Sequence, residues 1–222
     1  MKSDERLKHD VEEELRWDPS LNADTIIVSC KGGVVSLSGH VRTCAEKHTA
    51  ELALQRVVGV RALAIDLEVQ LRPEHERSDS EIAKAAMTAL KWSTIVGAQP
   101  KPDVDQIQVS VEHGWLTLRG EVEWEYQRRA AADAVRVLTG VKGVTNMITI
   151  TPQTSPFDVK SRILDAFKRQ VAREVEQMNI SVHDGTVTLS GKVDSVHERD
   201  AAQQTAWSAP GIRAVNNELT IG

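Results

Sequence analysis

The chain has few aromatic residues and no long apolar run. Aromatics make up 4% of its 222 residues, whereas 41% are hydrophobic, so the core must be built from Val, Leu, Ile and Ala. No run approaches the ~18 apolar residues that a membrane-spanning helix requires. The start of the chain is charged and has no signal-peptide stretch. We therefore expect a cytoplasmic protein, or a periplasmic one if a leader peptide has been removed.

Motifs for catalysis, metal binding and nucleic-acid binding are also missing. The two cysteines, Cys30 and Cys44, have no CxxC neighbour, and we expect structural roles for both rather than a disulfide. The seven histidines show no metal-ligand spacing, and no local motif suggests a nucleophile with its base. The net charge of −5 argues against nucleic-acid binding. We expect no enzyme, no cofactor and no metal.

What the sequence does have is a threefold repeat. Residues 33–41, 114–122 and 185–193 share the pattern Gly-x-[Val/Leu]-[Ser/Thr]-Leu-x-Gly-x-Val, and a further glycine follows 20 residues after the second one in each copy. These glycines lie in predicted hairpins and helix ends, so we interpret them as turn and cap residues and not as a phosphate loop. They are Gly33, Gly39, Gly59, Gly114, Gly120, Gly140, Gly185, Gly191 and Gly211.

Each copy has the periodicity of a small α+β module. In the first, Leu7, Val11 and Leu15 recur at helical spacing, whereas the residues from Ile26 onward alternate as in a strand. A two-residue turn and a second strand follow, then a second helix and a last strand. The sequence predicts three tandem αββαβ modules, each a three-stranded mixed sheet with two helices on one face. The predicted boundaries are 1–72, 77–152 and 155–222.

Two local features refine this prediction. Thr43-x-x-Glu46 and Ser195-x-x-Glu198 match the capping box that begins a helix. The second copy has Trp124 and Gln127 at these positions and departs from the rule. The predicted first helix of the third copy contains Val159 to Val171. Each module has about 70 residues and a marginal core, so we expect the copies to pack against one another.

The repeated run, with Gly140-Val141 then Asn146 and Gly211-Ile212 then Asn217, resembles the BON domain (bacterial OsmY and nodulation). The first copy has Ile65 in place of that Asn. The resemblance covers nearly the whole chain and implies a non-catalytic bacterial binding module or scaffold of osmotic or envelope stress. Family members are linked to phospholipid and to protein partners, and one cytoplasmic relative senses potassium. Binding to anionic phospholipid is our leading hypothesis; the alternatives are protein interaction or self-assembly, and potassium or small-ligand sensing.

Candidate binding residues gather in the second copy. Lys84 and Lys91 lie at helical spacing near Trp92, and together they suit a lipid headgroup; alternatively Trp92 folds under the long loop that follows it. Trp115 alternates with Thr117 on the polar side of its strand, either as an exposed anchor or packed on a neighbouring copy. Trp124, Tyr126 and Arg128 form either an aromatic and basic rim or a contact between modules. The predicted lipid or partner surface is Lys84, Lys91, Trp92, Trp115, Trp124, Tyr126 and Arg128.

Overall fold

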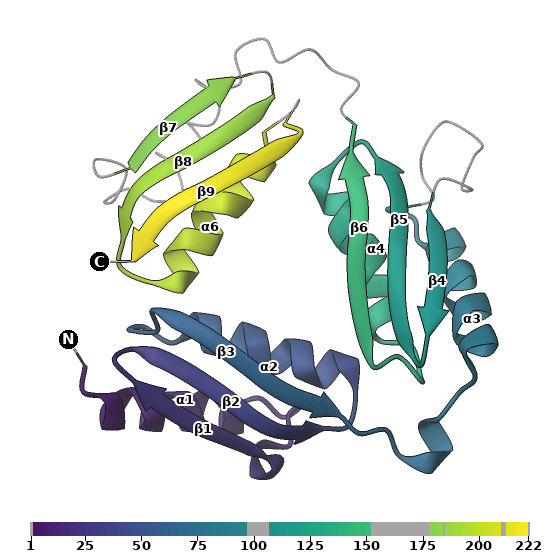
Figure 1. The fold of residues 1–222 in the computed structure, drawn as a ribbon, viewed down its shortest axis with the longest axis horizontal. Helices are drawn as coiled ribbons and strands as arrows, with labels where there is room; N and C mark the ends of the chain where they lie inside the picture. The colour runs from purple at the N-terminus through teal and green to yellow at the C-terminus, as the bar shows by residue number, and fades with distance from the viewer. Residues whose placement is uncertain (1, 97–106, 152–177, 184, 210–211, 222) are drawn as a thin grey trace.

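The computed structural model describes residues 2–96, 107–151, 178–183, 185–209 and 212–221. Within these ranges the chain forms three three-stranded sheets, ordered β1-β2-β3, β4-β5-β6 and β7-β8-β9 (Figure 1). In each sheet the first pair of strands is antiparallel and the second pair is parallel. The α+β fold of three repeated modules is therefore confirmed.

The elements follow the predicted order. The first module has α1 (Asp4–Trp17), a 3-10 turn (Ala23–Thr25), β1 (Ile26–Lys31), β2 (Val34–Val41), α2 (Cys44–Arg56) and β3 (Ala62–Val69). After a 3-10 turn (Pro73–His75), the second has α3 (Asp79–Trp92), β4 (Gln108–Glu112), β5 (Trp115–Val122), α4 (Glu125–Arg136) and β6 (Gly143–Ile150). The third has β7 (Met178–His183), β8 (Thr186–Val193), α6 (Val196–Trp207) and β9 (Ala214–Ile221). The first helix predicted for the third module, and Gly211, lie outside the described residues.

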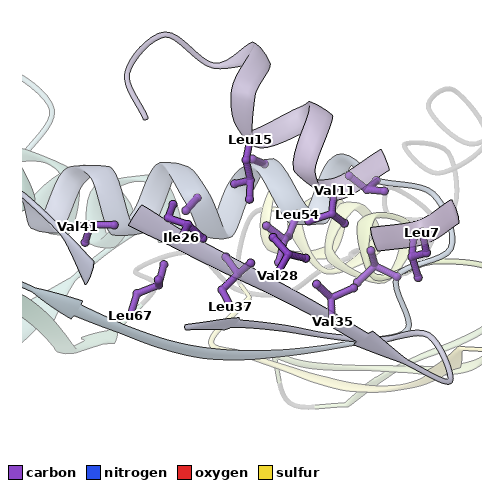
Figure 2. Close-up of a cluster of buried hydrophobic side chains, with 14 of the residues drawn as sticks. Leu7, Val11, Leu15, Ile26, Val28, Val35, Leu37, Val41, Leu54 and Leu67 are labelled. Atoms are coloured by element: carbon purple, nitrogen blue, oxygen red, sulfur yellow. The ribbon is translucent and has the colours of Figure 1, made fainter. Parts of the chain in front are cut away.

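The core of each module lies between its helices and one face of its sheet. In the first module, Leu7, Val11 and Leu15 of α1 point toward Val28 and Leu37 of the sheet (Figure 2). All five are buried. Burying a side chain of this kind contributes about 1.5–3 kcal/mol. The four-residue spacing on α1 and the alternation on the strands therefore serve the same core.

The hairpins explain the paired turn residues. Gly32 and Gly33 have φ of 61° and 80°, and His113 and Gly114 have 51° and 80°, as a tight two-residue turn between antiparallel strands requires. The first helix also holds the turn. The Asp79 carboxylate accepts hydrogen bonds from the backbone N–H groups of His113 and Gly114, both at 2.8 Å. Asp4 does the same for the first hairpin, a role that the sequence analysis did not assign.

The asparagine of the third strand ties that strand to the second helix. The Asn146 side chain donates to the carbonyl of Arg128 at 2.7 Å and accepts from the Ile148 N–H. Asn217 makes the same two contacts in the third module. The first module, which has Ile65 there, uses Lys47 instead, whose ammonium donates to the Leu67 carbonyl at 2.9 Å. In the first module a lysine contact thus takes the place of the missing asparagine contact and joins the same two elements.

The three modules contact one another through their second helices. The first residue of this helix is buried in every copy, as Cys44, Glu125 and Val196. Cys44 packs in the core of the second module, and Val196 packs in the core of the first. Glu125 lines a cavity together with Trp207 of the third. One position of the repeat therefore joins each module to another, as the marginal size of a single core led us to expect.

Candidate functional site

The outer side of α3 carries an exposed apolar and basic surface. Ser78 and Glu81 form a complete capping box at its start, and Ile82, Ala86 and Leu90 turn inward to the core. The opposite side is open to solvent. We call Lys84, Met87, Lys91, Trp92 and Ile95 the α3 surface. Trp92 is 81% exposed and Met87 is 64% exposed. Most of the long loop under which Trp92 was alternatively expected to fold lies outside the described residues. The structure thus brings three of the predicted candidates, Lys84, Lys91 and Trp92, onto one helix.

The first module carries a matched helix of different charge. Trp17 ends α1 as Trp92 ends α3, and it is 84% exposed. Residues 7–17 contain two basic and four acidic residues, whereas residues 82–92 contain two lysines and no acidic residue. The two helices therefore display a similar exposed tryptophan in opposite electrostatic surroundings. Comparing Trp17 with Trp92 therefore separates the contribution of an exposed ring to binding from the contribution of the local charge.

The other aromatic candidates lie at the junction of the second and third modules. Trp124 and Tyr126, at the start of α4, line a cavity of about 590 Å³ with Trp207 of α6. We call this space the aromatic cavity; Glu125, Arg129, Gln204 and Ser208 complete its lining. The Arg128 guanidinium lies 5.2 Å from the centre of the Trp207 ring. Contact between the two modules thus brings Trp207 to Trp124, Tyr126 and Arg128.

The charges of this junction are paired. Glu125 is 7% exposed, and its carboxylate lies 2.6 Å from Arg128 Nε and 3.1 Å from Arg129 Nε. A buried carboxylate needs such partners because desolvation penalises its charged form. A second cavity, of about 510 Å³, adjoins it among α2, α4 and α6 and is lined by Arg128, Arg129 and Asp200 among others. Burial raises the pKa of Asp200, and the neighbouring Arg199 opposes that shift.

Trp115 is placed apart from both surfaces. Its ring covers Gly143, which is its direct partner on the neighbouring strand β6. Its indole N–H donates to the Thr145 hydroxyl at 2.7 Å. A Cβ at position 143 would lie 2.5 Å from the ring, so only glycine fits there. Trp115 therefore packs within its own module rather than on a neighbouring copy, which was one of its two expected placements, and it stays 49% exposed.

The described part of the chain lacks both a membrane-spanning helix and a metal-binding cluster. Among these residues, no helix is long and apolar enough to span a bilayer. The same residues contain no cluster of three or more His, Cys, Asp or Glu side chains arranged to hold a metal ion. Cys30 and Cys44 are both free thiols; Cys44 is buried, and burial raises the pKa of its thiol.

Three repeated modules, each with a three-stranded mixed sheet and meeting through their second helices, define a tandem-module protein. The BON domain profile matches residues 3–70, 78–152 and 157–222. The chain therefore belongs to the BON domain family. It is also similar to osmotically-inducible protein Y of Escherichia coli strain K12, with 29% identity over 149 residues, which is 61% of this chain and 71% of that protein.

Comparison with solved structures shows only distant similarity. CdsD, a structural protein of the type III secretion system of Chlamydia trachomatis, is 17% identical, with 98% of this chain and 92% of that one covered at a TM-score of 0.25. The periplasmic domain of PrgH is 12% identical, with 89% and 95% covered at a TM-score of 0.24. Neither supports an argument about the arrangement of the modules.

Proposed function

We propose that this protein is a non-catalytic binding protein of the bacterial osmotic or envelope stress response, and that it docks on anionic phospholipid through the α3 surface. The family and the osmotically inducible relative support the stress role. The observation that carries the lipid proposal is the exposure of Trp92 and Met87 beside two lysines on a helix stretch without acidic residues.

The magnitudes favour reversible docking. Each lysine near an anionic leaflet contributes about 1 kcal/mol, and this term decays within a Debye length. An indole ring at the headgroup level adds apolar contact while its N–H stays hydrated. The net charge of −5 opposes any approach except through a local basic surface. We therefore expect weak binding that is strongest at low salt and confined to the α3 side.

Vesicle co-sedimentation tests this proposal. Mixed phosphatidylglycerol and phosphatidylcholine vesicles should sediment the protein at low salt, and pure phosphatidylcholine vesicles should not. The double change Lys91→Ala with Trp92→Ala should remove the bound fraction. The matched control Trp17→Ala removes an equally exposed ring from the acidic helix α1, and it should leave binding unchanged.

Two results would refute the lipid proposal. One is the absence of sedimentation at low salt, where the electrostatic attraction is greatest. The other is an equal loss of binding in Trp17→Ala, which would show that any exposed tryptophan binds vesicles, whatever the charge around it. A molecular mass of the protein that rises with its concentration in the absence of vesicles would instead favour self-assembly. A thermal shift with potassium but not sodium would favour ion sensing.

A further inference from the structure

The scarce aromatic residues of this chain are concentrated at one cavity. The sequence has five Trp, one Tyr and two Phe. Three of these eight, Trp124, Tyr126 and Trp207, line the aromatic cavity between α4 and α6. They come from two modules, so the cavity exists only where the second and third modules meet. Such a gathering in a chain whose cores use aliphatic residues requires its own explanation.

The other two copies of the repeat have no aromatic residue at the positions of Trp124 and Trp207. At the position of Trp124 the other copies have Thr43 and Ser195, whose side chains accept a hydrogen bond from the helix N-terminus. Trp124 gives up that bond, and only the Gln127 side chain still caps the helix, by accepting from the Trp124 N–H at 3.0 Å. At the position of Trp207 the other copies have Gln55 and Arg136. Trp207 also packs against the apolar cores of the second and third modules, but Trp124 breaks a capping rule, and a broken local rule points to function.

The lining combines ring faces with one charge of each sign. Faces of Trp and Tyr attract cations, most of all the methylated ammonium groups that cannot donate hydrogen bonds. The Trp207 ring already attracts a cation, since the Arg128 guanidinium lies over it. Arg129 and Glu125 both line the cavity, and the Arg129 guanidinium offers N–H donors beyond the Nε that faces Glu125. A ligand anion therefore has a partner beside the rings.

One donor in this lining is unused. The indole Nε1 of Trp207 is buried and has no hydrogen-bond partner among the described residues. A buried donor without an acceptor is unfavourable, and in native proteins it calls for an explanation such as a bound group. A ligand in the aromatic cavity could accept a hydrogen bond from this indole N–H after a small rotation of the Trp207 ring.

We infer that the aromatic cavity binds a small zwitterion in which a quaternary ammonium group is joined to a carboxylate. The rings of Trp124, Tyr126 and Trp207 surround the methylated cation, and Arg129 pairs with the carboxylate. A simple cation would be repelled, because the two positive charges of Arg128 and Arg129 exceed the single negative charge of Glu125. A simple anion would leave the ring faces unused. This site lies on other elements than the α3 surface, and it does not depend on the lipid proposal.

Isothermal titration calorimetry with glycine betaine tests the inference. The protein should show saturable heat with betaine and none with glycine, which lacks the methyl groups. It should bind 3,3-dimethylbutanoate much more weakly, because there a carbon replaces the charged nitrogen. Trp207→Ala should weaken betaine binding about tenfold, and Tyr126→Ala, at a side chain that is 58% exposed, should also weaken it.

A second variant separates binding from folding. Trp124→Thr restores the capping residue of the first copy, so it should raise the unfolding midpoint while it weakens betaine binding. Trp92→Ala, on the α3 surface, is the matched control and should leave the titration unchanged. The inference is overturned if betaine gives no heat, if 3,3-dimethylbutanoate binds equally well, or if Trp92→Ala causes the same loss. Sedimentation on pure phosphatidylcholine vesicles that is lost in Trp207→Ala would overturn it too, by assigning the site to a lipid headgroup.

Discussion

Gly39 offers a test of how tightly the first sheet is built. It lies at the end of the β1–β2 pairing with φ of 118°, and a Cβ there would lie 2.2 Å from the carbonyl oxygen of Thr25. The backbone conformation alone costs about 1–3 kcal/mol for a residue with a side chain. Relief of the clash also requires β1 to move by about an ångström from its paired position. We therefore expect Gly39→Ala to cost at least about 3 kcal/mol, a large part of the stability of a small module.

Gly32 in the same hairpin is the matched control. It also has positive φ, 61°, but a Cβ there meets nothing within 4 Å. Gly32→Ala should cost only about 1 kcal/mol, since a left-handed residue costs about 1–2 kcal/mol and the stiffer unfolded chain returns part of it. Hydrogen exchange of peptides from residues 4–69, with urea unfolding followed by circular dichroism, measures both. Equal costs for the two variants would refute the reasoning, because only the approach to Thr25 separates them.

Two further predictions concern acidic residues whose pKa values move in opposite directions. Hydrogen bonds from the N–H groups of Gly114 and His113 lower the pKa of Asp79 below its ordinary 3.8, so its stabilising effect is complete above that pH and is lost as the pH falls through the folded-state pKa. Asp79→Ala should destabilise the second module at neutral pH and not in strong acid, and a carboxyl NMR titration at or above 3.8 would contradict this. Burial raises the pKa of Asp200 above 3.8, so its charge costs stability once the pH rises through the folded-state pKa. Asp200→Asn should raise the unfolding midpoint at neutral pH and lose this advantage below about 3.8; a lower midpoint at neutral pH would show that the Arg199 contact dominates.

The fold was predictable because each element follows a local rule. The spacing of Leu7, Val11 and Leu15 requires a helix with one apolar side, and the turn pairs require positive φ that Gly tolerates. Three copies with the same spacing made each assignment independent evidence for the others. The position of the α3 surface followed as well, since Lys84, Lys91 and Trp92 lie on one helix. The lipid role of that surface stays a prediction.

Contacts between elements far apart in the sequence were not predictable. Trp207 occupies a repeat position that is polar in the other copies, so only the meeting of α4 and α6 reveals its role. In the sequence, Asp79 is an ordinary acidic residue in the first turn of a helix. Only the structure shows that its carboxylate accepts hydrogen bonds from the hairpin. Trp115 is different, because Gly143 is its neighbour in the β5–β6 register. A glycine opposite an aromatic residue on the neighbouring strand was a signal of this contact that the sequence contains.

The first residue of the second helix has two different roles in the three copies. Cys44 and Val196 bury small apolar side chains in another module, which is the stabilising choice. Glu125 buries a charge at the same position and needs both Arg128 and Arg129 to offset its desolvation. Replacing a buried ion pair with apolar residues is often neutral or stabilising, so packing alone does not account for Glu125. The copy that departs from the apolar choice is also the one that replaces a helix cap with Trp124, and both departures face the aromatic cavity. The junction of the second and third modules is therefore where this chain has exchanged stability for a specific arrangement of charge and aromatic surface.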